Sequence, residues 1–242
     1  MSTLASGLLD AWERGYERTP IERALLLLAV AEPGEPLDRL ARLGVGDRDA
    51  RLLTLRERAF GRHLESRMAC PACATQLEFA FTTDNVRVGG APAGDQWTLQ
   101  HDGYEVRVRL VNSTDLASLV IGEDLASNVR RLLARCVLAA SRDGQAVVVD
   151  ALPAHVVEHV SARLSDIDPQ ADVRIEAACP SCAHRWHAPF DIASYLWAEL
   201  HVWACRMLHD IHSMAAAYGW RESEILAVSP IRRQVYLDLI QS

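Results

Sequence analysis

The spacing of apolar residues predicts helices at the N-terminal end of the chain. Apolar positions recur every three or four residues over 4–16, 20–30, 37–43 and 47–60. Thr19 and Pro20 are typical of a helix N-cap and a first helical position, and Asp47 is expected to cap the fourth helix. Gly61 is typical of a helix end. We therefore expect residues 1–69 to form a helical N-terminal region.

The C-terminal part of the chain is also predicted to be helical. One apolar stripe follows residues 191–218 at spacings of three and four: Ile192, Leu196, Leu200, Trp203, Met207, Ile211, Met214 and Tyr218. Gly219 is expected to end this helix. Two shorter helices, over 222–228 and 230–240, should follow. Residues 191–242 are thus predicted to form a long helix with a helical tail.

The middle of the chain mixes the patterns of strands and helices. Leu77, Phe79 and Phe81 alternate with other residues, which predicts a strand. A hairpin is expected around Asp102-Gly103, a dipeptide typical of tight turns. The remaining segments are expected as a helix over 124–141, a strand over 146–150, a helix over 153–164 and a strand over 171–178. Together these elements predict an α+β fold.

The composition is that of an ordinary globular protein, and its charge argues against a nucleic-acid partner. Hydrophobic residues make up 50% of the chain and charged residues 24%. The net charge is −7, whereas proteins that bind nucleic acids normally carry a basic surface. The longest apolar run, 24–31, is too short to span a bilayer, and the first residues lack the pattern of a signal peptide. We therefore expect a cytoplasmic protein without membrane insertion.

Two short cysteine motifs are the strongest chemical signal in the sequence. They are Cys70-Pro71-Ala72-Cys73 and Cys179-Pro180-Ser181-Cys182. A gap of two residues places two thiolates on one side of a metal, and two such knuckles complete the tetrahedron that zinc prefers in structural sites. We predict one structural Zn²⁺ with Cys70, Cys73, Cys179 and Cys182 as its ligands. Four thiolates leave no open coordination position, so the metal is not expected to be catalytic.

The residues that flank the two cysteine motifs also match. When the first cysteines are aligned, Leu77 falls at the position of Trp186 and Phe81 at the position of Phe190. This indicates one knuckle-and-hairpin unit used twice, as in a zinc ribbon. The usual ribbon spacer is about 15–20 residues, whereas about 100 residues separate the two motifs here. We therefore predict a split zinc ribbon over residues 70–190 that carries an α/β insertion.

Several features leave alternatives open. Ala74 and Ala183 stand where many ribbons have glycine, and a left-handed turn is less favourable for alanine. The cysteine motifs could also be metal-free turns, or a redox site, although neither lies at the strand-to-helix junction that thioredoxin-like chemistry uses. His184 and His187 lie close enough to the second motif to replace a cysteine as ligand.

Two further groups of residues have both a functional and a purely structural interpretation. The long helix carries His201, Cys205, His209 and His212 on one side, which could bind a metal or could be a semi-polar flank. Arg130, Arg131 and Arg135 share a predicted helix and could grip an acidic partner or form a solvated face. No phosphate-binding loop, dinucleotide fingerprint, nucleophile elbow or metalloprotease motif occurs, so no enzymatic activity is expected.

The order of several segments resembles a known family. These segments are residues 21–28, 46–56, 70–73, 179–182, 190–199 and 218–230. Their order is similar to that of small baseplate proteins encoded with phage-like contractile injection systems, related to the T4-type baseplate protein family. Residues 89–171 contribute little to the resemblance.

The resemblance implies a structural or assembly role in the baseplate of a tail-like particle. Its partners would be other baseplate, hub, spike or tube proteins. Two alternatives stay open from the residues alone. One is a zinc-ribbon module that binds nucleic acid or acts in regulation, and the less favoured one is a CxxC redox protein.

Overall fold

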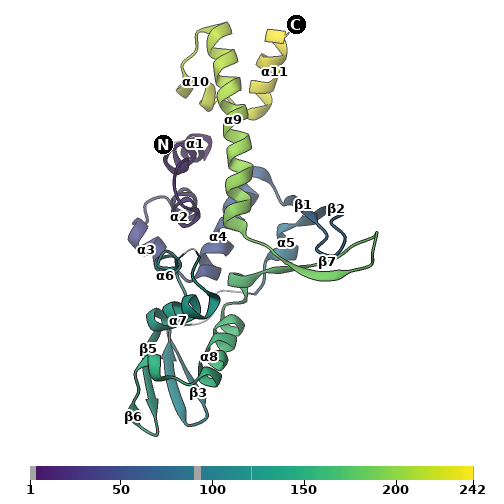
Figure 1. Ribbon diagram of the computed structural model, residues 1–242. Helices are drawn as coiled ribbons and strands as arrows, with labels where there is room; N and C mark the ends of the chain where they lie inside the picture. The colour runs from purple at the N-terminus through teal and green to yellow at the C-terminus, as the bar shows by residue number, and fades with distance from the viewer. Residues whose placement is uncertain (1–3, 90–93, 121, 242) are drawn as a thin grey trace. The chain divides into compact units, whose positions relative to one another are not determined.

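The computed structural model describes residues 4–89, 94–120 and 122–241, and it shows a mixed helix-and-sheet protein (Figure 1). The α+β prediction is therefore confirmed. Contacts group the chain into two compact units, one formed by residues 1–34 with 192–242 and the other by residues 35–191. The N-terminal and C-terminal helices thus share a unit, whereas the sequence-based division placed them in separate regions. That three-domain division stays a prediction.

The first unit is built from helices of both chain ends. They are α1 (Leu4–Gly15), α2 (Pro20–Ala31), α9 (Ile192–Tyr218), α10 (Glu222–Ala227) and α11 (Pro230–Gln241). Thr19 caps α2 as predicted: its hydroxyl accepts from the Glu22 amide at 3.4 Å, and the Glu22 carboxylate accepts from the Thr19 amide at 2.9 Å. Gly15 ends α1 against the ring of Trp197, where a Cβ atom would lie only 2.6 Å from a ring carbon.

The apolar stripe of α9 forms the core of this unit. Its buried members pack with residues of α1, α10 and α11 in one cluster: Leu9, Ala204, Met207, Ile211, Met214, Ile225 and Leu237. The stripe differs from the prediction at two positions. Trp203 is only partly buried, because Ala204 takes the central place, and Tyr218 is 37% exposed at the end of the helix.

The second unit holds the remaining elements. Its helices are α3 (Leu37–Ala41), α4 (Val45–Phe60), α5 (Thr83–Val86), α6 (Ser113–Leu116), α7 (Leu125–Cys136), η1 (Val149–Ala151), α8 (Ala154–Ile167) and η2 (Pro169–Asp172). Its strands are β1 (His63–Ala69), β2 (Gln76–Thr82), β3 (Trp97–His101), β4 (Tyr104–Val108), β5 (Val137–Arg142), β6 (Gln145–Ala146), β7 (Arg174–Ala178) and β8 (Arg185–Pro189).

Two predictions about element boundaries between residues 44 and 69 are wrong. The helical N-terminal region does not extend to residue 69, because β1 pairs along its whole length with β2. Helix α4 begins at Val45 with Gly44 as its N-cap, so Asp47 lies inside the first turn, where it pairs with Arg51 at 3.0 Å.

The sheet of this unit has four antiparallel strands in the order β3-β4-β5-β6. The hairpin turn predicted at Asp102-Gly103 is confirmed, with positive φ angles of 49° and 76°. Strand β5 was predicted as the end of a helix. The helix instead stops at Cys136, because Val137 and Ala140 pair with β4 and enter the core under the sheet. The strand predicted over 146–150 is mostly absent, because β6 ends at Ala146 and the 3-10 helix η1 begins at Val149.

The first turn of α4 is fixed by polar contacts that we call the α4 anchor. The amide of Val45 donates to the carbonyl of Val111 at 2.9 Å. The amide of Gly46 donates to the carboxylate of Asp168 at 3.0 Å, and Arg48 donates to the Ser113 hydroxyl at 3.3 Å. A Cβ atom on Gly46 would overlap the Asp168 carboxylate. Glycine is therefore needed at position 46 so that the carboxylate can reach the start of the helix.

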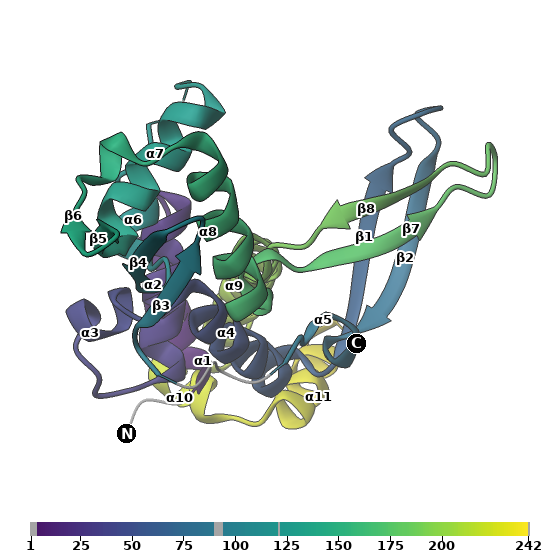
Figure 2. The ribbon, with the colours of Figure 1, turned by 90° about the horizontal axis from the view of Figure 1, so that it is seen from below.

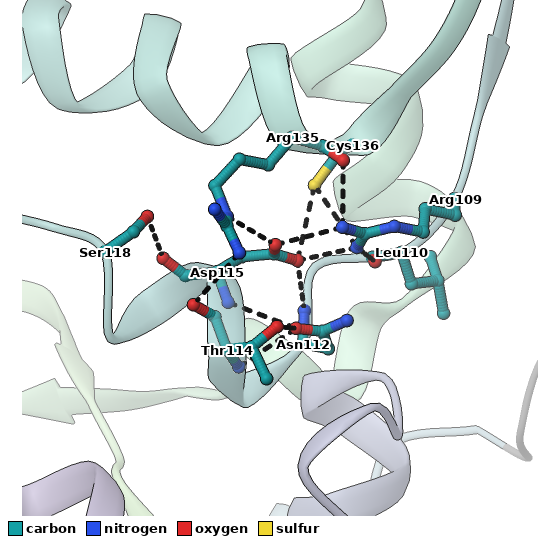
Figure 3. A network of polar contacts seen from close by, with 8 residues as sticks. All are labelled: Arg109, Leu110, Asn112, Thr114, Asp115, Ser118, Arg135 and Cys136. Atoms are coloured by element: carbon teal, nitrogen blue, oxygen red, sulfur yellow. Dashed lines mark hydrogen bonds and ion pairs between the residues drawn. The ribbon is translucent and has the colours of Figure 1, made fainter. Parts of the chain in front are cut away.

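A buried carboxylate joins α6 to α7 and to Arg109, the residue that follows β4 (Figure 3). The side chain of Asp115 is fully buried and accepts from Arg109 at 2.6 and 3.0 Å and from Arg135 at 2.9 Å. Burial opposes its ionisation, but hydrogen bonds from Arg109, the Asn112 amide and Arg135 outweigh burial and lower its pKa. Burial raises the pKa of Cys136 to about 12, so its thiol stays protonated and donates to Asp115 at 3.8 Å.

Among the described helices, none combines the length and the apolar character that a membrane span requires.

Candidate metal centre

The two cysteine motifs lie in the turns of two hairpins, β1–β2 and β7–β8, which cross at an angle in Figure 2. Strand β1 pairs with β2 from His63↔Thr82 to Ala69↔Gln76, and β7 pairs with β8 from Arg174↔Pro189 to Ala178↔Arg185. Each motif follows directly on the last pair of its ladder. The strand predicted after each motif is therefore present, and it pairs with the strand before the motif, so that the motif forms the hairpin turn.

The two turns repeat the same backbone hydrogen bonds. In the first turn, the amide of Cys70 donates to the carbonyl of Thr75 at 2.9 Å, and the amide of Ala74 donates to the carbonyl of Cys70 at 2.8 Å. In the second turn, Cys179 and Ala183 make the equivalent bonds, each at 2.9 Å. The two motifs thus adopt one conformation twice, as the matched sequences predict.

The four cysteine sulfurs form one cluster. The Sγ atoms of Cys70, Cys73, Cys179 and Cys182 all lie within 4.8 Å of one another. Two sulfur–sulfur contacts join the hairpins, at 3.7 Å from Cys70 to Cys182 and at 3.6 Å from Cys73 to Cys179. A tetrahedron with metal–sulfur bonds of about 2.3 Å has edges of about 3.8 Å, whereas a disulfide is about 2.05 Å long. The cluster therefore has the size of a tetrahedral metal site and could hold a metal ion.

A small aromatic cluster lies beneath the sulfurs. Cys70 and Cys179 are each only 2% exposed and pack with Leu77, whereas Cys73 and Cys182 are exposed. Two aromatic contacts join the two hairpins in edge-to-face geometry. The ring pairs are Phe79 with Trp186 at 6.4 Å and Phe81 with Phe190 at 5.6 Å. Phe81 and Phe190 are the residues that the alignment of the motifs places at equivalent positions.

Ala74 and Ala183 occupy left-handed backbone conformations, with φ angles of 60° and 59°. Such a conformation costs an L-residue other than glycine about 1–2 kcal/mol. Both turns therefore carry strain at the position where the sequence lacks the expected glycine. The amide of each alanine still donates to the carbonyl of the first cysteine of its motif.

The thiols of the cluster differ in their affinity for protons. The hydroxyl and the backbone amide of Thr75 donate to the sulfur of Cys73 and lower its pKa to about 6. Although the backbone amide of His184 favours the thiolate of Cys182, the neighbouring sulfurs outweigh it and raise the pKa of Cys182 to about 12. Four thiolates cannot form side by side without a compensating cation, and a divalent metal would supply that charge.

The histidines proposed as substitute ligands do not join the cluster. His184 stacks on Trp186 at 5.8 Å, and His187 lies opposite Glu176 in the β7–β8 ladder. Among the described residues, the four cysteines are the group whose ligand atoms already lie within 4.8 Å of one another.

His201, the first histidine of α9, is held by a hydrogen bond from α1. Trp12 Nε1 donates to Nδ1 of His201 at 3.0 Å. An indole nitrogen only donates, so Nδ1 of His201 carries no proton and Nε2 must carry it in the neutral ring. That proton faces the sulfur of Cys205, 4.0 Å away. The ring nitrogen nearest the cysteine therefore has no lone pair available for a metal.

Two of the three arginines of α7 form ion pairs within the protein. Arg135 pairs with Asp115 at 2.9 Å, and Arg131 pairs with Glu123 at 2.9 Å. Neither the Asp115 network nor the α4 anchor could be predicted from the sequence. Their residues form no known motif, and the partners are common polar residues that lie far apart in the chain.

Comparison with protein families identifies the chain. A family model described as T4 bacteriophage base plate protein matches residues 36–197, which is more than half of the chain. The chain belongs to the T4 bacteriophage base plate protein family. The resemblance predicted from the sequence is thereby confirmed. The part that matches this base plate family contains both cysteine motifs, all of α4 and the beginning of α9. No curated protein and no solved structure matches the chain.

Proposed function

We propose that this chain is a structural or assembly component of the baseplate of a phage tail-like contractile injection particle, and that it carries a structural zinc. The match to the base plate family over residues 36–197 is the observation that carries this proposal. The protein would assemble in the cytoplasm with other baseplate, hub, spike or tube proteins and would have no enzymatic activity of its own.

The donor set supports zinc as the metal. All four candidate ligands, Cys70, Cys73, Cys179 and Cys182, are thiols, and their sulfurs have tetrahedral spacing. Four soft sulfur ligands favour zinc or iron over harder cations, and zinc in such sites is structural. The residues present therefore fit a closed site in which the metal does no chemistry on a substrate.

The metal would act as a clasp between two hairpins. The sulfur contacts join residues that lie 106 and 112 positions apart in the sequence. The aromatic cluster below the sulfurs is small, so we expect the metal to supply most of the rigidity of the paired hairpins. Rigid hairpins would give neighbouring baseplate subunits a surface of fixed shape.

A deletion and complementation experiment in the host that produces the particle tests the baseplate role. Without this gene, we expect no particles with assembled baseplates in electron micrographs, and restoration by the wild-type gene. An epitope-tagged copy should sediment with sheath and tube proteins if the chain remains in the particle. Normal numbers of fully assembled, contractile particles in the deletion strain would overturn the proposal.

A nucleic-acid titration separates this role from that of a nucleic-acid-binding zinc ribbon. The net charge of −7 leads us to expect no binding to duplex DNA or to RNA even at low salt. Salt-dependent binding with a basic footprint would favour the other role.

A further inference from the structure

Three histidines and one carboxylate gather at one end of the four-stranded sheet, outside the cysteine cluster. His101 is the last residue of β3, and Asp102 begins the β3–β4 turn. His155 and His159 lie four positions apart on α8, so they share one face of that helix. The rings of His101 and His159 stack with centroids 4.1 Å apart, and His155 lies 5.8 Å from His101.

The hydrogen bond of His155 prepares this ring to bind a metal. The Asp102 carboxylate lies 3.1 Å from Nε2 of His155. Because a carboxylate only accepts, Nε2 carries the proton, and the lone pair of a neutral ring then lies on Nδ1. A carboxylate that accepts from one nitrogen of a histidine, while the other nitrogen binds a metal, is the usual arrangement around protein metal sites.

The other two rings also have nitrogens that the described protein does not use. Within residues 4–89, 94–120 and 122–241, no hydrogen bond engages a ring nitrogen of His101 or His159. The site is open to solvent, since the side chains of His155 and Asp102 are 51% and 69% exposed. His201 differs from these rings because Trp12 donates to its Nδ1. A metal can bind Nε2 of a neutral ring only when the proton is on Nδ1, and the hydrogen bond from Trp12 prevents this.

We propose that His101, His155 and His159 form a second metal site, for a divalent transition metal that prefers imidazole, with Asp102 positioning His155. Imidazole ligands suit zinc, nickel and copper. The ring nitrogens are not gathered as closely as the four sulfurs, so a bound metal draws the rings together and separates His101 from its stack on His159. The metal then ties the β3–β4 turn to α8. This site is independent of the cysteine cluster and of the baseplate role.

Nickel titration of the full-length, tag-free protein, followed by amide NMR, tests the site residue by residue. Paramagnetic Ni²⁺ is expected to broaden the amide signals of residues 101–103 and 155–159 first, at less than one equivalent, while the signals of both cysteine turns persist. Calorimetry under the same conditions should give one site, with a dissociation constant that weakens at least tenfold in the His155→Ala/His159→Ala protein.

Two further variants test the role of Asp102 and the specificity of nickel binding. Asp102→Asn keeps a residue that tolerates the positive φ angle of 49° at this turn, and we expect about tenfold weaker nickel binding because a partner of a ligand is lost. His63→Ala removes an exposed histidine of β1 and should change nothing. The proposal is overturned if nickel broadens no signals of residues 101–103 and 155–159, or if the double histidine variant binds nickel as tightly as the wild type.

Discussion

The cysteine cluster and the α4 anchor both join segments that are distant in sequence, but they do so by different means. The cluster links Cys73 to Cys179, 106 positions apart, and its thiols need a cation to ionise together. The anchor links Gly46 to Asp168, 122 positions apart, through a carboxylate and a backbone amide of the protein itself. Two cysteine motifs with the same spacing make the cluster visible in the sequence, whereas the anchor consists of a glycine and common polar residues.

A contact between distant segments can therefore be structurally important whether or not its residues form a recognisable sequence motif. The cysteines stand over a small apolar cluster, so the geometry of their hairpins depends on a ligand. The anchor lies beside α4, whose Leu52, Leu53 and Leu55 are almost completely buried. We therefore expect the cluster to respond to metal removal and oxidation, and the anchor to respond to changes of shape and charge.

The largest expected effect is the loss of one cysteine from the cluster. Cys70→Ser should abolish stoichiometric metal binding and lower the free energy of unfolding by about 4 kcal/mol or more, because three thiolates hold a structural metal poorly. Thermal unfolding with elemental analysis measures both. Cys205→Ser is the matched control, since Cys205 is exposed and lies outside the cluster. Equal loss of stability in both variants would contradict the metal clasp.

The next largest effect is expected at the anchor. Gly46→Ala places a Cβ atom against the Asp168 carboxylate and should lower the free energy of unfolding by about 2–3 kcal/mol without changing the metal content. Gly7→Ala is a matched control in helix α1, where the added Cβ would meet Val30 at an ordinary 3.6 Å. The control should be neutral or stabilising by up to about 1 kcal/mol. Chemical denaturation distinguishes the two, and an unaffected Gly46→Ala protein would remove the anchor from the account.

The Asp115 network provides a smaller effect that depends on pH. Asp115→Asn should cost about 2 kcal/mol at neutral pH, because two arginines lose a charged acceptor. The folded-state pKa of Asp115 is lowered, so its stabilisation is present above the unfolded-state pKa of about 4 and is lost as the pH falls through the lower folded value. The stabilities of the wild type and the variant should therefore converge as the pH falls below the lowered folded-state pKa of Asp115. A constant difference across the acid range would contradict the assigned ionisation.

Asp49 is expected to act in the opposite direction. Burial raises its folded-state pKa to about 6, although Arg48 opposes this. A carboxyl group with a raised pKa stabilises the folded state as the pH falls, and its contribution grows from about pH 6 to about pH 4, by at most about 3 kcal/mol. Asp49→Asn should remove this gain. Unfolding free energies measured between pH 4 and 7 test the sign, and a wild type that loses stability over that interval as strongly as the variant would disprove it.

The smallest expected effect is a gain in the two cysteine turns. Ala74→Gly and Ala183→Gly each relieve a left-handed alanine and should stabilise the metal-bound protein by about 0.5–1 kcal/mol. Thermal unfolding of the metal-bound protein measures the gain. Destabilisation by both changes would show that the alanine side chains contribute more than the strain costs.

Sequence reasoning succeeded where chemistry or periodicity is local. The cysteine motifs, the Thr19 cap, the Asp102-Gly103 turn and the helix ended by Gly61 all have short-range patterns, and the structure contains each of them. Whether the four cysteines bind zinc stays a prediction.

The errors arose where distant segments decide the local structure. Strand β5 continues the helical pattern of α7 in sequence, and only pairing with β4 makes it a strand. The start of α4 moved to Val45 because Val111 and Asp168 hold its first amides, and neither residue is near it in the chain. The grouping of the two chain ends into one unit likewise rests on contacts between α1, α2 and α9.

The metal content of the protein decides whether the four cysteines form a zinc site. Native mass spectrometry of protein purified without added metal or chelator should show one zinc per chain, and replacement by cobalt should give the intense sulfur-to-cobalt absorption of a tetrathiolate site. Cys70→Ser should lose both signals, and Cys205→Ser should keep them. A folded wild-type protein that binds no zinc, while all six of its cysteines react as free thiols, would contradict the account.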